Sequence, residues 1–142
     1  MRSTRLLAPI LAILLLAAGR DSAACSCHPP PPPDEALKEA AAVFVGKVVK
    51  VEPTKGAEKD GITAVLEVSK AWKGIETARV SVATNAHGSL CGFGFVVGTE
   101  YMVYADGKSA AELSTSACTR SRPAAEADDD LRALGEPVKT FP

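Results

Sequence analysis

Four cysteines limit the folds that are open to this chain of 142 residues. They are Cys25, Cys27, Cys91 and Cys118, and all of them lie downstream of an apolar N-terminal stretch whose pattern predicts export. An even number of cysteines in an exported chain predicts two disulfides, because the compartments outside the cytoplasm are oxidising. A structural zinc site with His28 or His87 is the alternative, but a Cys-x-Cys pair followed by two lone cysteines is not the usual paired spacing. A disulfide across one intervening residue is strained, so both early cysteines should pair far along the chain.

Residues 1–24 have the pattern of a signal peptide. Arg2 and Arg5 precede an apolar run from Leu6 to Ala18, and a short polar step then leads to small residues at positions 22 and 24. These small residues fit a signal-peptidase cut that leaves Cys25 as the first residue, with a free α-amino group. We therefore expect a secreted or periplasmic protein.

The same stretch allows a second interpretation. Ser22-Ala23-Ala24-Cys25 also fits a lipoprotein signal, in which the cysteine carries lipid, its amine is blocked and the protein is anchored to a membrane. Arg20 and Asp21 separate the apolar run from Cys25 and argue against it, because lipoprotein sites usually adjoin that run. A lipidated Cys25 could neither form a disulfide nor present a free amine.

Cleavage after Ala24 leaves 118 residues, enough for one domain at 25–135 followed by a flexible tail at 136–142. Cleavage removes three Arg and one Asp, so 16 basic and 17 acidic residues become 13 and 16, a net charge of −3. This charge gives no indication of nucleic-acid binding. No later apolar run approaches the roughly 20 residues of a membrane-spanning helix. We expect a monomer.

Hydrophobic periodicity predicts an all-β fold with minor helices. Apolar and polar residues alternate in three segments, at residues 42–52, 62–69 and 79–82, which predicts strands there. We expect a fourth strand at 101–105 and a weaker fifth at 110–115. Before them, Asp34 is expected to cap a short helix through Ala41. After them, a helix from 123 to 135 should place Asp128, Asp129 and Asp130 on its solvated face. These elements suit a five-stranded OB-like closed β-barrel, and a small sandwich also fits the periodicity.

The chain carries none of the local motifs of common catalytic sites. It has no Gly-x-Ser-x-Gly, no His-Glu-x-x-His and no phosphate-binding glycine loop. His28 and His87 are the only histidines, and both are expected on the surface. We expect no enzymatic activity and no catalytic residue. The glycine-rich stretch 84–98, which contains Cys91, is where a functional loop could lie.

A mature N-terminus on a disulfide-bonded cysteine offers metal chemistry of its own. The α-amine and the carbonyl of Cys25 can form a five-membered chelate, and disulfides at Cys25 and Cys27 would hold it rigid. Such preorganisation lowers the entropic cost of binding. The open zinc of a metallopeptidase, which keeps one position for water, is a natural target.

Several motifs of the mature chain resemble one family, the tissue inhibitors of metalloproteinases and the wider netrin-like modules. These motifs are Cys25-Ser26-Cys27-His28-Pro29-Pro30, Ala42-Val43-Phe44-Val45-Gly46-Lys47-Val48, Ala71-Trp72-Lys73-Gly74, Ser89-Leu90-Cys91-Gly92, Glu100-Tyr101-Met102-Val103 and Cys118. The cysteine spacings are the most specific part. The resemblance covers the N-terminal inhibitory domain only, because the animal inhibitors' third bridge in that domain and their cysteine-rich second domain are missing here.

The resemblance implies a fold, a disulfide pairing and a site. The fold is an OB-like barrel, and the pairing is Cys25 with Cys91 and Cys27 with Cys118. The implied partner is a zinc metallopeptidase whose catalytic zinc is chelated by the Cys25 amine and carbonyl, so the protein needs no cofactor of its own. The implied inhibitory wedge consists of Cys25, Ser26, Cys27, His28, Ser89 and Leu90, with Ser26 entering the pocket beside the metal. The competing function is a binding module that kept the barrel and lost inhibition.

Overall fold

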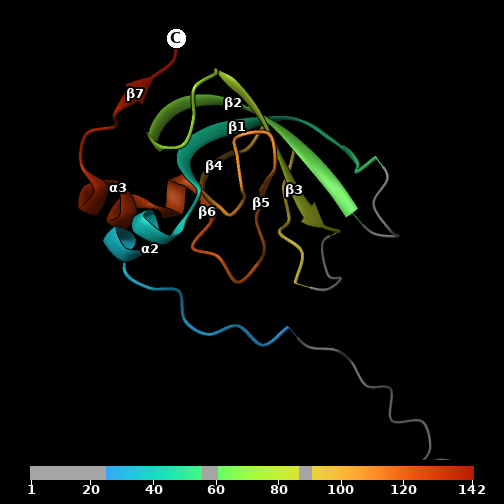
Figure 1. Ribbon diagram of the computed structural model, residues 1–142, viewed down its shortest axis with the longest axis horizontal. Helices are drawn as coiled ribbons and strands as arrows, with labels where there is room; N and C mark the ends of the chain where they lie inside the picture. Colours follow the sequence, from blue (N-terminus) through green and yellow to red (C-terminus); the bar gives the residue numbers. More distant parts are fainter. Residues whose placement is uncertain (1–24, 56–60, 87–90) are drawn as a thin grey trace, which may run out of the picture.

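A computed structural model describes residues 25–55, 61–86 and 91–142, which form a strongly curled β-sheet with two α-helices packed beside it (Figure 1). The strands are β1 (Ala42–Pro53), β2 (Gly61–Lys73), β3 (Arg79–Asn85), β4 (Glu100–Ala105), β5 (Leu113–Ser114), β6 (Arg122–Pro123) and β7 (Lys139–Thr140). The helices are α2 (Pro33–Glu39) and α3 (Asp128–Leu134), and a 3-10 turn, η1 (Ala124–Glu126), precedes α3.

Strands β1 to β5 close into a ring. The strand order is β5-β3-β2-β1-β4-β6, with β7 beside β2. Among the described strands, β3 and β5 pair in parallel and the other pairs are antiparallel. Asp106, which follows β4, completes the ring. Its N–H donates to the Ser114 carbonyl and its carbonyl accepts from the Ser114 N–H, each at 2.8 Å. The predicted all-β, OB-like fold is confirmed.

The fifth strand is shorter than predicted. It covers Leu113–Ser114 rather than 110–115, because the chain before it forms an exposed turn in which the Glu112 N–H donates to the Ser109 carbonyl at 3.0 Å. A side chain at Gly107 would meet the Glu112 carbonyl oxygen at 2.3 Å, so this turn approaches its own backbone closely. The apolar residues at 110 and 111 therefore lie in a turn.

Strand β1 buries side chains on both of its faces. Phe44 and Val48 belong to the cluster inside the barrel, whereas Val43 and Val45 belong to a second cluster between the sheet and the helices. A register irregularity between Val48 and Lys50 shifts the alternation along the strand. The predicted pattern of one buried and one wet face therefore holds for only part of β1, because α2 and α3 cover its outer face.

Both predicted helices need correction. Asp34 lies in the first turn of α2 instead of capping it, because Pro32 is the N-cap residue and makes no side-chain cap bond. The predicted helix from 123 to 135 begins instead as β6 and η1, and only Asp128–Leu134 is α-helical, ending at Gly135 with φ of 66°. Asp130 was expected on a solvated face and is fully buried.

The C-terminal residues, which we predicted to be a flexible tail, pair with the sheet. Lys139 and Thr140 form β7 against β2, and the Phe141 N–H donates to the Ser69 carbonyl at 2.9 Å. Phe141 also packs against the inner core. In the part of the chain that the structure describes, no helix is both long enough and apolar enough to cross a membrane.

Candidate functional site

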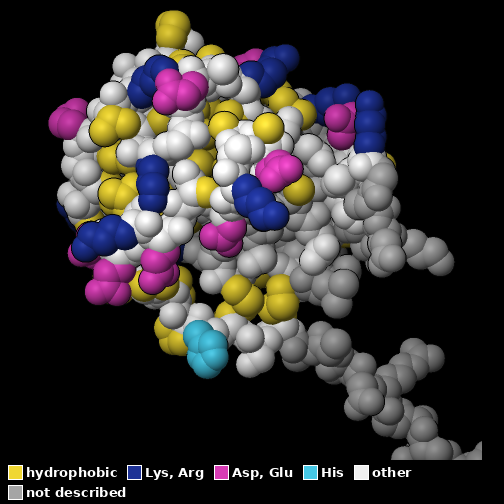
Figure 2. Space-filling model, viewed as in Figure 1, with side chains coloured by type: hydrophobic (Ala, Val, Ile, Leu, Met, Phe, Trp, Pro, Cys, Tyr) yellow, Lys and Arg dark blue, Asp and Glu magenta, His cyan; other side chains and the backbone are white. Residues whose placement is uncertain are grey.

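The first four described residues, Cys25 to His28, lie on the outside of the molecule. All four are exposed, and Figure 2 shows this N-terminal segment below the body of the domain. No sheet partner or helix includes them. Their position is therefore set by the disulfides and by the chain that follows.

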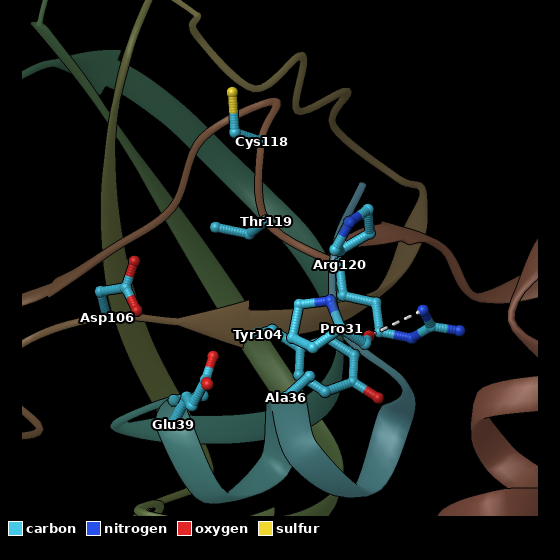
Figure 3. Close-up of a pocket in the computed structure, with 10 residues that line it drawn as sticks. Pro31, Ala36, Glu39, Tyr104, Asp106, Cys118, Thr119 and Arg120 are labelled. Carbon is cyan, nitrogen blue, oxygen red and sulfur yellow. Dashed lines mark hydrogen bonds between the residues drawn. The ribbon is translucent and has the colours of Figure 1, made fainter. Parts of the chain in front are cut away.

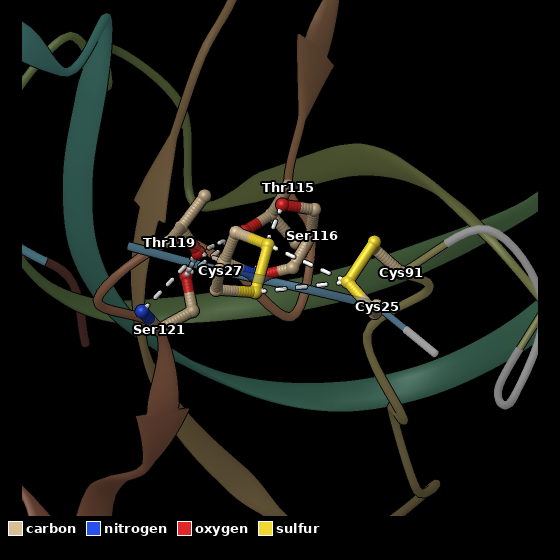
Figure 4. Close-up of a disulfide and its surroundings, with 8 residues drawn as sticks. Cys25, Cys27, Cys91, Thr115, Ser116, Thr119 and Ser121 are labelled. Carbon is tan, nitrogen blue, oxygen red and sulfur yellow. Dashed lines mark hydrogen bonds between the residues drawn. A yellow bond between two sulfur atoms is a disulfide. The ribbon is translucent and has the colours of Figure 1, made fainter. Parts of the chain in front are cut away.

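Two disulfides join this segment to the barrel, and both match the predicted pairing. Cys25 is bonded to Cys91 with a Cα–Cα distance of 5.3 Å, and Cys27 to Cys118 with one of 5.1 Å. The Sγ atom of Cys25 also lies 3.6 Å from the Sγ atoms of Cys27 and Cys118, so the four sulfurs form one cluster (Figure 4). A lipid on the Cys25 sulfur would be incompatible with the first disulfide, which argues against the lipoprotein interpretation.

The loop that carries Cys91 is held in an unusual backbone conformation. Cys91 has a φ of 62°, in the left-handed region that residues other than glycine seldom adopt. Its carbonyl accepts a hydrogen bond from the Ala117 N–H at 2.8 Å, which ties this loop to the one that carries Cys118. The next residue, Gly92, is buried. The site therefore depends on three segments that meet at one end of the barrel.

Gly92 gives a test of how closely this loop is packed. A Cβ atom there would stand 2.3 Å from the carbonyl oxygens of Asn85 and Ala86, so the backbone would have to move. We expect Gly92→Ala to lower the free energy of unfolding by about 1–3 kcal/mol, measured by urea denaturation. Val97→Ala, at a side chain that is 58% exposed in the same loop, should change it by less than about 0.5 kcal/mol. Equal stability of the two variants would contradict the close packing at Gly92.

A network of hydroxyl groups holds the Cys118 loop, and the sequence analysis did not predict it. The Thr115 hydroxyl lies 2.8 Å from that of Thr119 and 3.0 Å from that of Ser121, three side chains that Figure 4 shows close together. The Thr115 hydroxyl also donates to the Tyr104 carbonyl at 3.2 Å. The Cys118 N–H donates to the Ser116 hydroxyl at 3.2 Å. The density of Ser and Thr around Cys118 was the available signal, since these residues readily bond nearby backbone groups in loops.

Comparison with known families identifies the relationship. The family model described as tissue inhibitor of metalloproteinase matches residues 23–125, more than half of the chain. The chain belongs to this family. A search of curated proteins found no match. The matched range contains all four cysteines and ends before α3, so α3 and β7 lie outside it.

Membership in a family of inhibitors fits the expectation that this chain is not an enzyme. Of the residues that we predicted for the inhibitory wedge, the structure places Cys25 and Cys27 in the disulfide cluster. Ser26 and His28 are their exposed neighbours in sequence. Ser89 and Leu90 lie outside the described residues, as does His87. Their placement beside Cys25 stays a prediction.

The disulfide cluster also bears on metal binding by the protein itself. Among the described residues, the one group of three or more ligand side chains close enough to share an ion is Cys25, Cys91 and Cys118. All three sulfurs are in disulfides, and a thiolate is the form of cysteine that ligates metals. The backbone groups of Cys25 take no part in its disulfide.

Proposed function

We propose that the mature protein is an exported inhibitor of zinc metallopeptidases that chelates the target's catalytic zinc through the α-amine and carbonyl of Cys25. The observation that carries the proposal is the exposed Cys25–Ser26–Cys27 segment, fixed to the barrel by a disulfide on each side of Ser26. Family membership supports the same class of partner.

Rigidity and exposure are both needed for this function. A peptide that enters an active-site cleft loses conformational entropy, and this loss is smaller when the bound shape already exists in the free protein. Cys25 to His28 are all exposed, so within the described residues this segment is open to a partner. The Ser26 side chain is small enough to enter a pocket beside the zinc while the Cys25 amine and carbonyl coordinate it.

In this proposal the remaining predicted contacts flank the chelating residue. Ser89 and Leu90 precede Cys91, whose disulfide to Cys25 brings that point of the chain to the N-terminus. We propose that they form the second part of the surface that meets the peptidase. His28 follows on the other side of Ser26 and would contact the cleft further from the metal.

The test is inhibition of a panel of zinc metalloendopeptidases by protein processed to begin at Cys25, confirmed by mass measurement. We expect stoichiometric inhibition of at least one panel member and none of serine or cysteine peptidases. If no zinc peptidase is inhibited by correctly processed, disulfide-bonded protein, the proposal is wrong and a binding module without inhibitory activity becomes the better hypothesis.

The pH dependence of inhibition provides a second arm of this test. Only the neutral amine can bind zinc. The pKa of an α-amine in a peptide is ordinarily about 7.7 to 8.0. Protonation therefore competes with chelation, and the apparent affinity should fall by about tenfold for each pH unit below this range. A hydroxamate inhibitor of the same peptidase, measured in parallel, separates this loss from titration of the enzyme. An affinity that follows the hydroxamate's pH profile would count against the amine as the ligand.

A further inference from the structure

A buried carboxylate on α3 is the centre of an ion-pair network next to the N-terminal segment. Asp130 is fully buried, and its Oδ1 accepts from Arg120 Nε at 2.6 Å and from the Tyr104 hydroxyl at 2.7 Å. Arg120 Nη2 reaches its Oδ2 at 3.4 Å, and Arg122 Nε lies 3.9 Å from the same oxygen. Burial and the Asp130 carboxylate raise the pKa of Tyr104, so its hydroxyl remains a donor.

Arg120 also contacts the proline run, residues 29–33, which follows the N-terminal segment. Its Nη1 donates to the Pro31 carbonyl at 3.1 Å, as Figure 3 shows. Arg120 follows Cys118 by two residues, and Cys118 is bonded to Cys27. One side chain therefore joins α3, the Cys118 loop and the proline run.

The proline run leads from His28 into α2, whose first residue is Pro33, so the helix holds the end of the run. Residues 29–33 are all proline and have no backbone N–H to donate. In the part of the chain that the structure describes, the bond from Arg120 is the one hydrogen bond recorded between this run and the barrel. A cavity of about 180 Å³ lies behind the run, lined by Pro31, Tyr104 and Asp106 among others (Figure 3). The contact between Pro31 and the barrel is therefore incompletely packed on this side.

We propose that Arg120, anchored on the buried Asp130, is a positioning residue that holds the Pro31 carbonyl and so sets the orientation of Cys25–His28 toward a peptidase. The effect of this positioning on inhibition rests on the proposed function. Asp130 lies on α3, beyond residue 125, where the family match ends. The planar guanidinium suits the task because it can bond a carboxylate and a carbonyl at the same time.

The decisive variant is Arg120→Lys. An ammonium group keeps the charge opposite Asp130 but cannot reproduce the fork that spans Asp130 and Pro31. Two measurements are made on correctly processed protein: heteronuclear NOEs of the Ser26, Cys27 and His28 amides, and the inhibition constant for a peptidase that the wild type inhibits. We expect lower NOEs at these amides and inhibition weakened by about tenfold.

Two matched controls separate positioning from general stability. Arg132→Lys alters an exposed ion pair with Asp129 on the same helix, where the arginine side chain is 75% exposed. Val80→Ala removes methyl groups from the inner core and lowers stability without touching the network. Both controls should keep the NOEs and the inhibition constant of the wild type at temperatures where they are folded.

Each outcome decides the proposal. Unchanged NOEs in folded Arg120→Lys overturn it, whatever happens to inhibition, because a positioning residue must act on the segment. Lower NOEs with unchanged inhibition also overturn it. If the wild type inhibits no peptidase, the proposed function fails separately, and the NOEs alone then decide whether Arg120 positions the segment. Should Arg120→Lys not fold, Asp130→Asn, which removes the anchor's charge and keeps its shape, takes its place with the same expectations.

Discussion

One extra alanine ahead of Cys25 is expected to weaken inhibition of a zinc peptidase by about 100-fold or more, equivalent to about 2.7 kcal/mol of binding free energy. The extension converts the α-amine into an amide, whose nitrogen has no lone pair available for zinc. It also places an additional residue where the metal should be, with polar groups that lose water without gaining partners. An unsatisfied buried polar group alone costs about 1–3 kcal/mol.

The extension should leave the fold unchanged, which makes it a sharp test. Cys25 to His28 are exposed and outside any helix or strand, so an added residue has room. Thermal denaturation and peptide mapping under non-reducing conditions check that both disulfides form. A protein carrying one alanine after Pro142 is the matched control and should inhibit like the wild type. Equal inhibition by the N-terminally extended and the processed protein would falsify zinc chelation by the Cys25 amine.

The barrel could be predicted from the sequence because its strands alternate apolar and polar residues. The apolar positions Ala64, Leu66 and Val68 of β2 and Val80 and Val82 of β3 are buried, as the alternation predicts, whereas Ile62 at the start of β2 is half-buried. The prediction was wrong for the outer face of β1, because the alternation indicates which face is buried in the barrel and says nothing of helices, here α2 and α3, that cover the other face. It also overestimated the fifth strand, since β-propensity depends strongly on tertiary context.

The burial of Asp130 could have been predicted from the sequence. Three adjacent acids were assigned together to the solvent, but successive helical residues point about 100° apart, so three of them cannot share one narrow face. Position 130 follows the buried Ala127 by three residues and precedes Leu134 by four, which places it on the apolar side. What the sequence could not reveal is its partner, because Arg120 lies ten residues away in a loop.

The disulfide pairing was implied by the family resemblance and not by the residues alone. Cysteine count left more than one pairing open, and the distances that decide it depend on how the barrel brings loops together. In the structure, the Ala117 N–H to Cys91 carbonyl bond and the hydroxyl network around Thr115 create that proximity. Both features involve loops, whose conformation is the part of a fold that periodicity does not address.

Removal of the Cys27–Cys118 disulfide by a double substitution to serine is expected to lower stability by about 4–5 kcal/mol. The bridge spans 91 positions in sequence, and the chain-entropy model gives nearly this value for a closed loop of such length. Net stabilities of domains are about 5–15 kcal/mol, so the loss is a large fraction of the total. We expect a fall in Tm of roughly 15 °C, measured by calorimetry. A change in unfolding free energy below about 1 kcal/mol would contradict the estimate.

Both cysteines of a bridge must be replaced together in this experiment. The Cys25 and Cys118 sulfurs are 3.6 Å apart, so a single substitution leaves a thiol within reach of the other disulfide, and thiolates exchange with disulfides that they can contact. The resulting mixture of pairings would obscure the stability of the intended variant. Counting free thiols, with none expected in either double variant, checks that exchange has not occurred.

Comparison of the two double variants separates stability from inhibition. The Cys25–Cys91 bridge spans 66 positions and the other 91, and because the entropy depends on the logarithm of loop length, the two losses should differ by only about 0.3 kcal/mol. Their effects on inhibition should differ much more. Without Cys27–Cys118, Cys25 is still bonded to Cys91, whereas without Cys25–Cys91 the residue that we propose as the zinc ligand is itself released. At a temperature where both variants are folded, the variant that lacks Cys25–Cys91 should therefore inhibit more weakly, and equal inhibition by the two would show that fixing residue 25 does not contribute.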